Sequence, residues 1–234
     1  MVLPRPSGGR KYGAARHENE TMKTDELIAM LANGTTAVES DVLRRRYAMA
    51  LGWGACGTVL LMAIALGVQP DLAAAARLPM FWVKLAYPAT LLAGALLAVL
   101  RLSRPGALLG HVPAAIATPV LVMWLLAGTV LFGASPGERV AMIMGVSADS
   151  CPFSIALLSI PLFIAALWAM RGLAPTRLAL SGAAAGLVAG AGGALVYSLY
   201  CTEMAAPFIG IWYLCGMLIP AAIGALAGPR LLRW

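Results

Sequence analysis

Six long runs of apolar residues, separated by short polar segments, dominate the hydrophobic pattern of the chain. A helix that crosses the bilayer core of about 30 Å needs about 20 consecutive apolar residues. The runs cover residues 47–68, 80–100, 113–134, 151–170, 178–200 and 205–228, and Lys84 is the only Asp, Glu, Lys or Arg within them. We therefore predict an all-α integral membrane protein, a six-transmembrane-helix bundle over residues 47–234.

The composition supports this prediction and leaves no room for a second folded domain. Of the 234 residues, 61% are hydrophobic and 12% are charged, whereas soluble domains carry about 25% charged residues. A soluble globular protein is therefore excluded. Outside the apolar runs, the longest piece of chain is the segment of residues 1–46.

The net charge of +7 has two possible meanings, nucleic-acid binding or membrane orientation, and the positions of the basic residues distinguish them. Six spans put both termini on one side. That side holds 14 of the 17 Lys and Arg residues, in the tail, in the loops after the second and fourth spans, and at the C-terminus. Because cytoplasmic loops carry the excess of basic residues, we predict that both termini are cytoplasmic. The charge then requires no nucleic-acid partner.

The N-terminal tail has two parts. Residues 1–21 are rich in Gly, Pro and Arg without apolar periodicity, so we expect a disordered extension. From Met22, a possible Thr24 N-cap precedes acidic residues and a short apolar stripe, formed by Asp25, Glu26, Leu27, Ile28, Met30 and Leu31. A helix of this length is unstable alone. One alternative is that it lies along the membrane surface or against the cytoplasmic loops. The other is that it binds a partner through its apolar stripe, with the acidic residues facing basic surroundings.

Two cysteines, Cys151 and Cys201, fall at span ends on the predicted non-cytoplasmic side, close in sequence to Asp149 and Glu203. Because Pro152 suits the first turn of a helix, we expect Cys151 to be the N-cap of the fourth span, which would lower its thiol pKa. If both thiols are exposed, Cys151 would be the attacking thiol and Cys201 the resolving one. The spacing leaves three readings open: a structural disulfide, a redox or metal sensor with Cys151 and Cys201 as candidate metal ligands, and unrelated packing cysteines.

The remaining polar groups in the spans are few. Cys56 and Cys215 lie near the middle of the first and sixth spans, where we expect them to be packing residues. Lys84 lies about one turn inside the outer end of the second span; it either snorkels outward or pairs with Asp149 or Glu203. Glycines repeat every four residues at 182, 186 and 190, and again at 224 and 228, which predicts close helix packing.

Several of these segments together resemble the NrsF family of six-span bacterial inner-membrane proteins, which are anti-sigma factors for extracytoplasmic-function sigma factors. The resemblance covers residues 22–234. It rests on Met22-Lys23-Thr24-Asp25-Glu26-Leu27-Ile28, Phe81-Trp82-Val83-Lys84, Cys151-Pro152, Leu167-Trp168-Ala169-Met170-Arg171, Cys201 with Glu203, Ala206-Pro207-Phe208 and Trp212-Tyr213. Residues 1–21 precede the family pattern, so we expect Met22 to be the true start.

The resemblance implies that residues 22–46 bind a sigma factor, and that the outer cysteines take part in sensing a metal or oxidative stress. The expected partners are that sigma factor and the lipid bilayer; no cofactor and no enzymatic activity are expected. The alternative from another class is a membrane thiol-disulfide oxidoreductase that reduces quinone, although such enzymes generally use a Cys-x-x-Cys pair that this chain lacks. A permease is disfavoured, because the spans carry so few polar groups.

Overall fold

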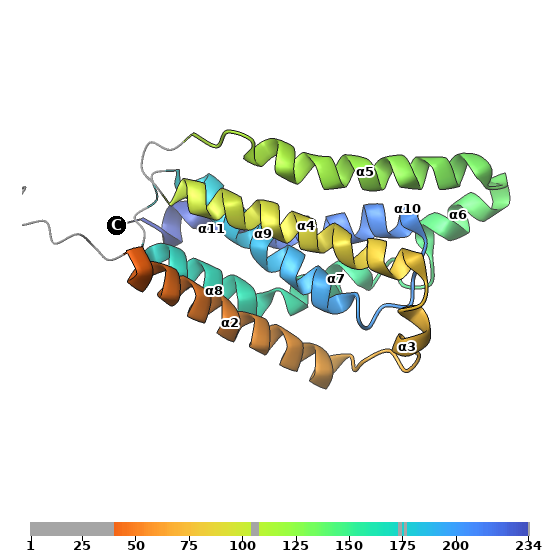
Figure 1. Ribbon diagram of the computed structural model, residues 1–234, viewed down its shortest axis with the longest axis horizontal. Helices are drawn as coiled ribbons and strands as arrows, with labels where there is room; N and C mark the ends of the chain where they lie inside the picture. The colour runs from red at the N-terminus through yellow and green to blue at the C-terminus, as the bar shows by residue number, and fades with distance from the viewer. Residues whose placement is uncertain (1–39, 104–107, 173–174, 176, 234) are drawn as a thin grey trace, which may run out of the picture. The chain divides into compact units, whose positions relative to one another are not determined.

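The computed structural model describes residues 40–103, 108–172, 175 and 177–233, and within these residues helices are its only regular secondary structure, with no strand. By its internal packing the chain divides into two units, Met1–Val42 and Leu43–Trp234. The long helices form the second unit (Figure 1), in which the start of the first helix and the C-terminus lie at the same end. The described helices are α2 (Ser40–Ala65), α3 (Leu72–Ala75), α4 (Pro79–Leu102), α5 (Val112–Gly133), α6 (Pro136–Met144), α7 (Cys151–Leu158), α8 (Ile160–Arg171), α9 (Leu178–Tyr197), α10 (Ala206–Phe208), the π-helix η1 (Ile209–Tyr213) and α11 (Leu214–Leu231).

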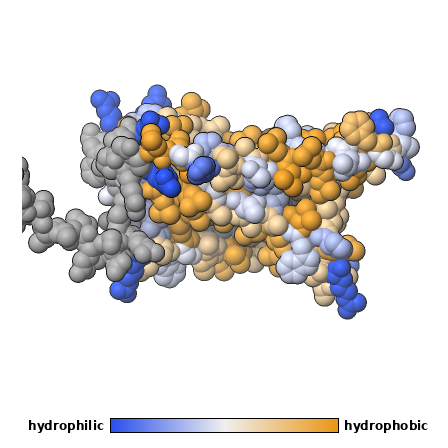
Figure 2. Space-filling model, turned by 45° about the horizontal axis from the view of Figure 1, so that its top comes forward, coloured by the Kyte–Doolittle hydropathy of each residue, from blue (hydrophilic) through white to orange (hydrophobic). Residues whose placement is uncertain are grey.

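The predicted all-α membrane bundle is confirmed. Five helices in the described part of the chain are long and apolar enough to cross a membrane, and the count becomes six if α7 and α8 form one span. Figure 2 shows the corresponding surface, in which hydrophilic residues gather at the two ends of the helices and hydrophobic residues cover much of the surface between them. Such a surface is what a bilayer requires on its lipid-facing side.

The fourth span is not one straight helix, as its apolar run had suggested. It bends by 44° between α7 and α8 at Ser159. Pro161, two residues after Ser159, has no N–H to continue the helical hydrogen bonds, while the Ser159 hydroxyl donates to the Ile155 carbonyl at 2.7 Å. A proline and a back-bonded serine therefore account for the bend.

Helix α9 forms the centre of the unit, and its glycines pack against α11. Gly190 approaches α11 so closely that an added Cβ would lie 2.6 Å from the Met217 carbonyl oxygen. Added Cβ atoms at Gly182 and Gly186 would be closer still to the backbone of Gly224 and Pro220. Small residues let two helix backbones approach in a membrane. The predicted packing role of these glycines is confirmed.

Helix α5 packs far less tightly than α9. It buries only Val112, Met123 and Ala127, whereas α9 is buried over most of its length. Two apolar grooves lie beside α5: one between α4 and α5, and one that also includes α9 and α11. At the end of the helices that carries α3, α6 and α10 (Figure 1), the short helices and loops form the candidate site described next.

Candidate functional site

The Lys84 side chain is fully buried in the second turn of α4. Its ammonium donates hydrogen bonds to the backbone carbonyls of Cys201 and of Glu203, the latter at 3.0 Å, and lies 5.9 Å from the centroid of the Tyr213 ring. These carbonyls follow the C-terminal end of α9, where a positive charge is favourable. The expectation that Lys84 snorkels outward is wrong. Its partner at Glu203 is the backbone carbonyl rather than the carboxylate.

The Glu203 carboxylate fixes residues 201–203 to a second part of the chain, in addition to their contact with Lys84 of α4. Its Oε1 accepts a hydrogen bond from the Val146 backbone N–H at 2.7 Å, in the loop between α6 and α7. Gly145 makes this approach possible: its φ is +52°, and an added Cβ would lie 2.8 Å from the Glu203 Oε1. Residues 201–203 therefore link α4 to the α6–α7 loop. We call these three residues the 201–203 strap.

Both cysteines of the predicted outer pair are buried in this region. Cys151 is 0% exposed and Cys201 is 3% exposed, both are free thiols, and both belong to one buried cluster with Tyr197 and Tyr213. The Cys151 thiol interacts with the Tyr197 hydroxyl, and the Cys201 thiol interacts with the Lys84 ammonium. Because the thiols are buried, a reagent in water can reach them only after a local movement of the fold.

Cys151 is the first residue of α7 rather than its N-cap, which is Ser150. The expected N-cap position is therefore wrong by one residue, since Pro152 occupies the second helical position. Asp149 is exposed. Among the described residues, no three His, Cys, Asp or Glu side chains lie close enough to hold a metal ion together, so Asp149 and Glu203 do not complete a four-ligand set around the thiols.

The two mid-span cysteines do not pack inside the bundle. Cys56 in α2 and Cys215 in α11 are both exposed on the surface of the unit, so the expectation that they are packing residues is wrong. Both spans are apolar on every side, which leaves the sequence without a signal for the face that turns inward.

Sequence reasoning missed two tryptophans that hold the same end of the bundle together. Trp124 of α5 donates to the Gly210 carbonyl at 3.0 Å, and Trp212 of η1 donates to the Ile143 carbonyl at 2.8 Å. The wider helical turns of η1 follow Pro207. A tryptophan within a span is an available signal, because its buried indole N–H needs an acceptor, but the acceptor cannot be identified from sequence.

The predicted partner-binding residues Asp25, Glu26, Leu27, Ile28 and Leu31 lie outside the described residues. His111 is exposed at the start of α5, at the end of the helices away from the strap. The structure therefore brings together four of the predicted site residues, Lys84, Cys151, Cys201 and Glu203, but not Asp149.

Comparison with known proteins identifies relatives over nearly the whole chain. Residues 31–234 match the family model NrsF, described as negative regulator of sigma F. The chain is 56% identical over 213 residues to the probable anti-sigma-F factor NrsF of Azospira oryzae, a match that covers 91% of this chain and 100% of that protein. It is 39% identical over 215 residues to the anti-sigma-F factor NrsF of Caulobacter vibrioides, again with coverage of 91% and 100%. No solved structure matches the chain.

Proposed function

The chain belongs to the NrsF family of negative regulators of sigma F, and on that premise we propose that it sequesters an extracytoplasmic-function sigma factor at the bacterial inner membrane. Family membership is the observation that carries this proposal, and it points to a regulatory rather than an enzymatic role. A bundle with long apolar helices keeps the regulator in the membrane, so a sigma factor bound to it is withheld from RNA polymerase.

The proposed sigma-binding segment is residues 22–46. Residues 22–43 contain one Lys and four acidic residues, a net charge of −3 on a chain that is otherwise basic. The apolar side chains of Leu27, Ile28 and Leu31 recur at a helical spacing, which suits binding in a groove of a partner. A segment that folds on binding can release its partner without loss of the membrane domain.

The proposed orientation places both termini in the cytoplasm. The exposed arginines Arg101, Arg171, Arg177 and Arg230 lie near helix ends on the side of the C-terminus. The opposite side carries a mixture of acidic and basic residues. The excess of positive charge on the side of the termini supports the cytoplasmic assignment, and it makes the strap periplasmic.

The proposed sensor is the pair Cys151 and Cys201 with the strap. Oxidation by a two-electron oxidant would join the two sulfurs in a disulfide, and the thiols would lose two protons and two electrons. Alternatively, a thiophilic metal ion would bind Cys151 and Cys201 as thiolates and displace their protons. Either reaction moves Cys201 relative to Lys84. Because a hydrogen bond to a charged group contributes about 1.5–3 kcal/mol, loss of the Lys84 contacts would favour a rearrangement of the strap.

The proposed route to the cytoplasmic side is α9. The strap follows the C-terminal end of α9, and α9 packs along α11 through backbone contacts at its glycines. Two tightly packed helices move against each other as rigid bodies rather than deforming gradually, so a shift at one end of α9 also moves its other end. A displacement at the strap is proposed to shift α9 against α11 and thereby to release the sigma factor from residues 22–46.

Sequestration can be tested by purifying the full chain in detergent with its cognate sigma factor. We expect the two proteins to purify together, and we expect Leu27→Lys and Ile28→Lys to abolish the association. Ala29→Lys is the matched control, since position 29 falls on the opposite side of a helix from Leu27. Loss of the sigma factor from all three variants, or from none, would contradict a binding face formed by Leu27 and Ile28.

A further inference from the structure

An apolar groove of about 620 Å³ lies among α4, α5, α9 and α11. Every one of its lining side chains is Leu, Ile, Val, Ala or Pro. Its volume falls within the range of about 300–1,000 Å³ that is typical of ligand sites. The groove exists because α5 packs loosely against the other helices and buries few of its residues. Since its lining is apolar, the groove must hold an apolar molecule when the protein is in a membrane.

The groove extends through one half of the bilayer. On α4 it runs from Leu91 to Leu102, which is about 16 Å at 1.5 Å per residue. The hydrocarbon core is about 30 Å thick, so the groove matches the depth of a single leaflet. That leaflet is the one on the side of the C-terminus, because Leu102 is the last residue of α4 and this end of α4 lies beside the C-terminus in Figure 1. A lipid acyl chain has the shape for such a site.

Two exposed arginines lie close in sequence to residues that line the groove. Arg101 is exposed, and its Nη1 lies 3.5 Å from the Leu108 carbonyl oxygen, directly before the lining residue Leu109. Arg177 is also exposed and precedes the lining residue Leu180 by three positions. No Asp or Glu occurs at residues 101–113 or 171–182. Basic residues at the mouth of a pocket between transmembrane helices favour an anionic lipid headgroup.

We propose that this groove is a binding site for one anionic phospholipid, with an acyl chain along α5 and the phosphate beside Arg101. The lipid supplies the apolar neighbour that α5 lacks on this side and thereby attaches α5 to α9 and α11. The inference is independent of sigma-factor binding.

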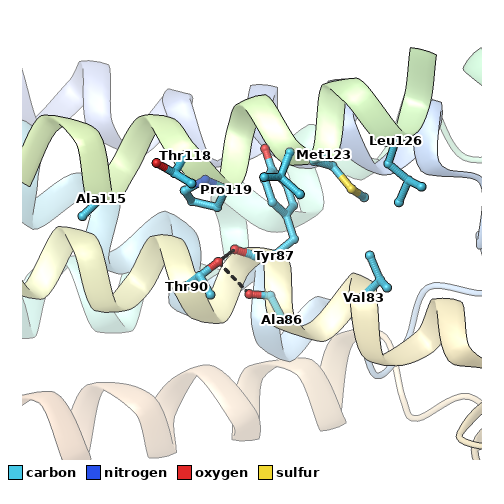
Figure 3. A pocket seen from close by; sticks show the side chains of 10 residues that line it. Val83, Ala86, Tyr87, Thr90, Ala115, Thr118, Pro119, Met123 and Leu126 are labelled. Atoms are coloured by element: carbon cyan, nitrogen blue, oxygen red, sulfur yellow. Dashed lines mark hydrogen bonds between the residues drawn. The ribbon is translucent and has the colours of Figure 1, made fainter. Parts of the chain in front are cut away.

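The second groove beside α5 serves as an internal comparison. It has a volume of about 550 Å³ and lies between α4 and α5 (Figure 3), with Tyr87 extending from α4 toward α5 and Thr90 bonded to carbonyls of its own helix. Like the first groove, it has no charged lining residue, but no exposed Arg or Lys lies within three positions of any residue that lines it. It therefore offers no basic partner for the headgroup of a bound lipid, and we expect anionic and zwitterionic lipids to exchange in it equally.

The test uses the full chain purified in detergent and titrated with phosphatidylglycerol or with phosphatidylcholine of the same acyl chains. Native mass spectrometry counts retained lipids. We expect one phosphatidylglycerol to be retained in preference to phosphatidylcholine, and Arg101→Gln to weaken its retention about fivefold, the loss expected for one basic residue near a headgroup. Arg139→Gln, an equal loss of charge at the other end of the bundle, should leave retention unchanged. Equal retention of the two lipids, or equal effects of the two variants, would overturn the proposal.

A second measurement identifies the occupant directly and does not depend on the stability of a charge variant. A photo-crosslinking amino acid in place of Ala117, which lines the groove on α5, is activated in membranes. We expect an adduct with the mass of an anionic phospholipid, whereas the same label in place of Ala86, in the comparison groove, should capture lipids without preference. A crosslink from position 117 to a second copy of the chain, or to residues before Ser40, would show that protein fills the groove and would overturn the proposal.

Discussion

Alanine in place of Gly186 adds one methyl group to the contact between α9 and α11. The new Cβ would lie 2.6 Å from the Pro220 carbonyl carbon and 2.7 Å from the Ala221 Cα, whereas ordinary contact begins at 3.4 Å. These are backbone atoms of a helix, which cannot turn away as a flexible side chain can. The two helices would have to separate by about 1 Å, since a packed interior has no spare volume.

The expected loss of stability follows from two opposing effects. Forcing an extra methyl group into a packed interface costs about 1–3 kcal/mol. Alanine in place of glycine stabilises a helix by about 1 kcal/mol, because it restricts the unfolded chain. We expect Gly186→Ala to lower the free energy of unfolding by up to about 2 kcal/mol, with larger residues at position 186 costing more.

Thermal unfolding of the full chain in detergent, followed by the helical circular dichroism signal, measures this change. Gly128→Ala in α5 is the matched control, because an added Cβ at position 128 has no atom within 4 Å. The control should unfold at the same temperature as the wild type or at a higher one. A Gly186→Ala chain as stable as this control would refute the close packing of α9 on α11.

Three further predictions concern the end of the bundle that carries the strap. Glu203→Ala should lower the free energy of unfolding in the same assay by about 1 kcal/mol, because the Val146 N–H loses its acceptor, and Glu203→Gln should retain part of that stability. A water-soluble maleimide should label Cys201 slowly in the wild type and faster in Lys84→Met, where the strap loses its donor; equal labelling rates would contradict the holding role of Lys84. Hydrogen bonds from the Ser135 hydroxyl and amide hold the pKa of Glu138 below its usual range, so the cap of α6 persists at neutral pH and is lost as the pH falls through that lowered pKa. Amide exchange in α6 should therefore be slower in the wild type than in Glu138→Gln at neutral pH, and the difference should vanish in acid.

The membrane spans and the close packing of the glycines of α9 could be predicted, because each depends on a local sequence pattern. Runs of apolar residues define spans by length alone, and glycines four residues apart on α9 place small residues on one side of a helix. The bend at Ser159 also had a local signal in Pro161, which the uninterrupted hydrophobicity of the run concealed. Such features need no knowledge of which helices are neighbours.

The rotation of each helix could not be predicted. Cys56 and Cys215 were expected to pack inside the bundle, and both lie on its surface. A soluble helix shows its buried side by hydrophobic periodicity, but a span that is apolar on all sides has no such periodicity. Only the contacts of neighbouring helices determine which side turns inward.

Lys84 illustrates the same limit at the candidate site. Its depth in the span marked it as a functional candidate, and Glu203 was one of its expected partners. The actual acceptors are backbone carbonyls of the strap, which are available because the last helical hydrogen bond after α9 is donated by the Cys201 N–H and the next helix, α10, begins only at Ala206. Every residue carries a carbonyl, so sequence alone cannot indicate which carbonyls a buried ammonium will contact.

We propose that thiol chemistry at the strap releases a sigma factor held at the membrane. The share of the sigma factor in the membrane fraction of cells, before and after addition of an oxidant, tests this proposal in the wild type and in Cys151→Ser/Cys201→Ser. We expect the membrane-bound share to fall in the wild type and to stay constant in the double variant. Equal release from both chains, or a sigma factor that never fractionates with the membrane, would contradict it.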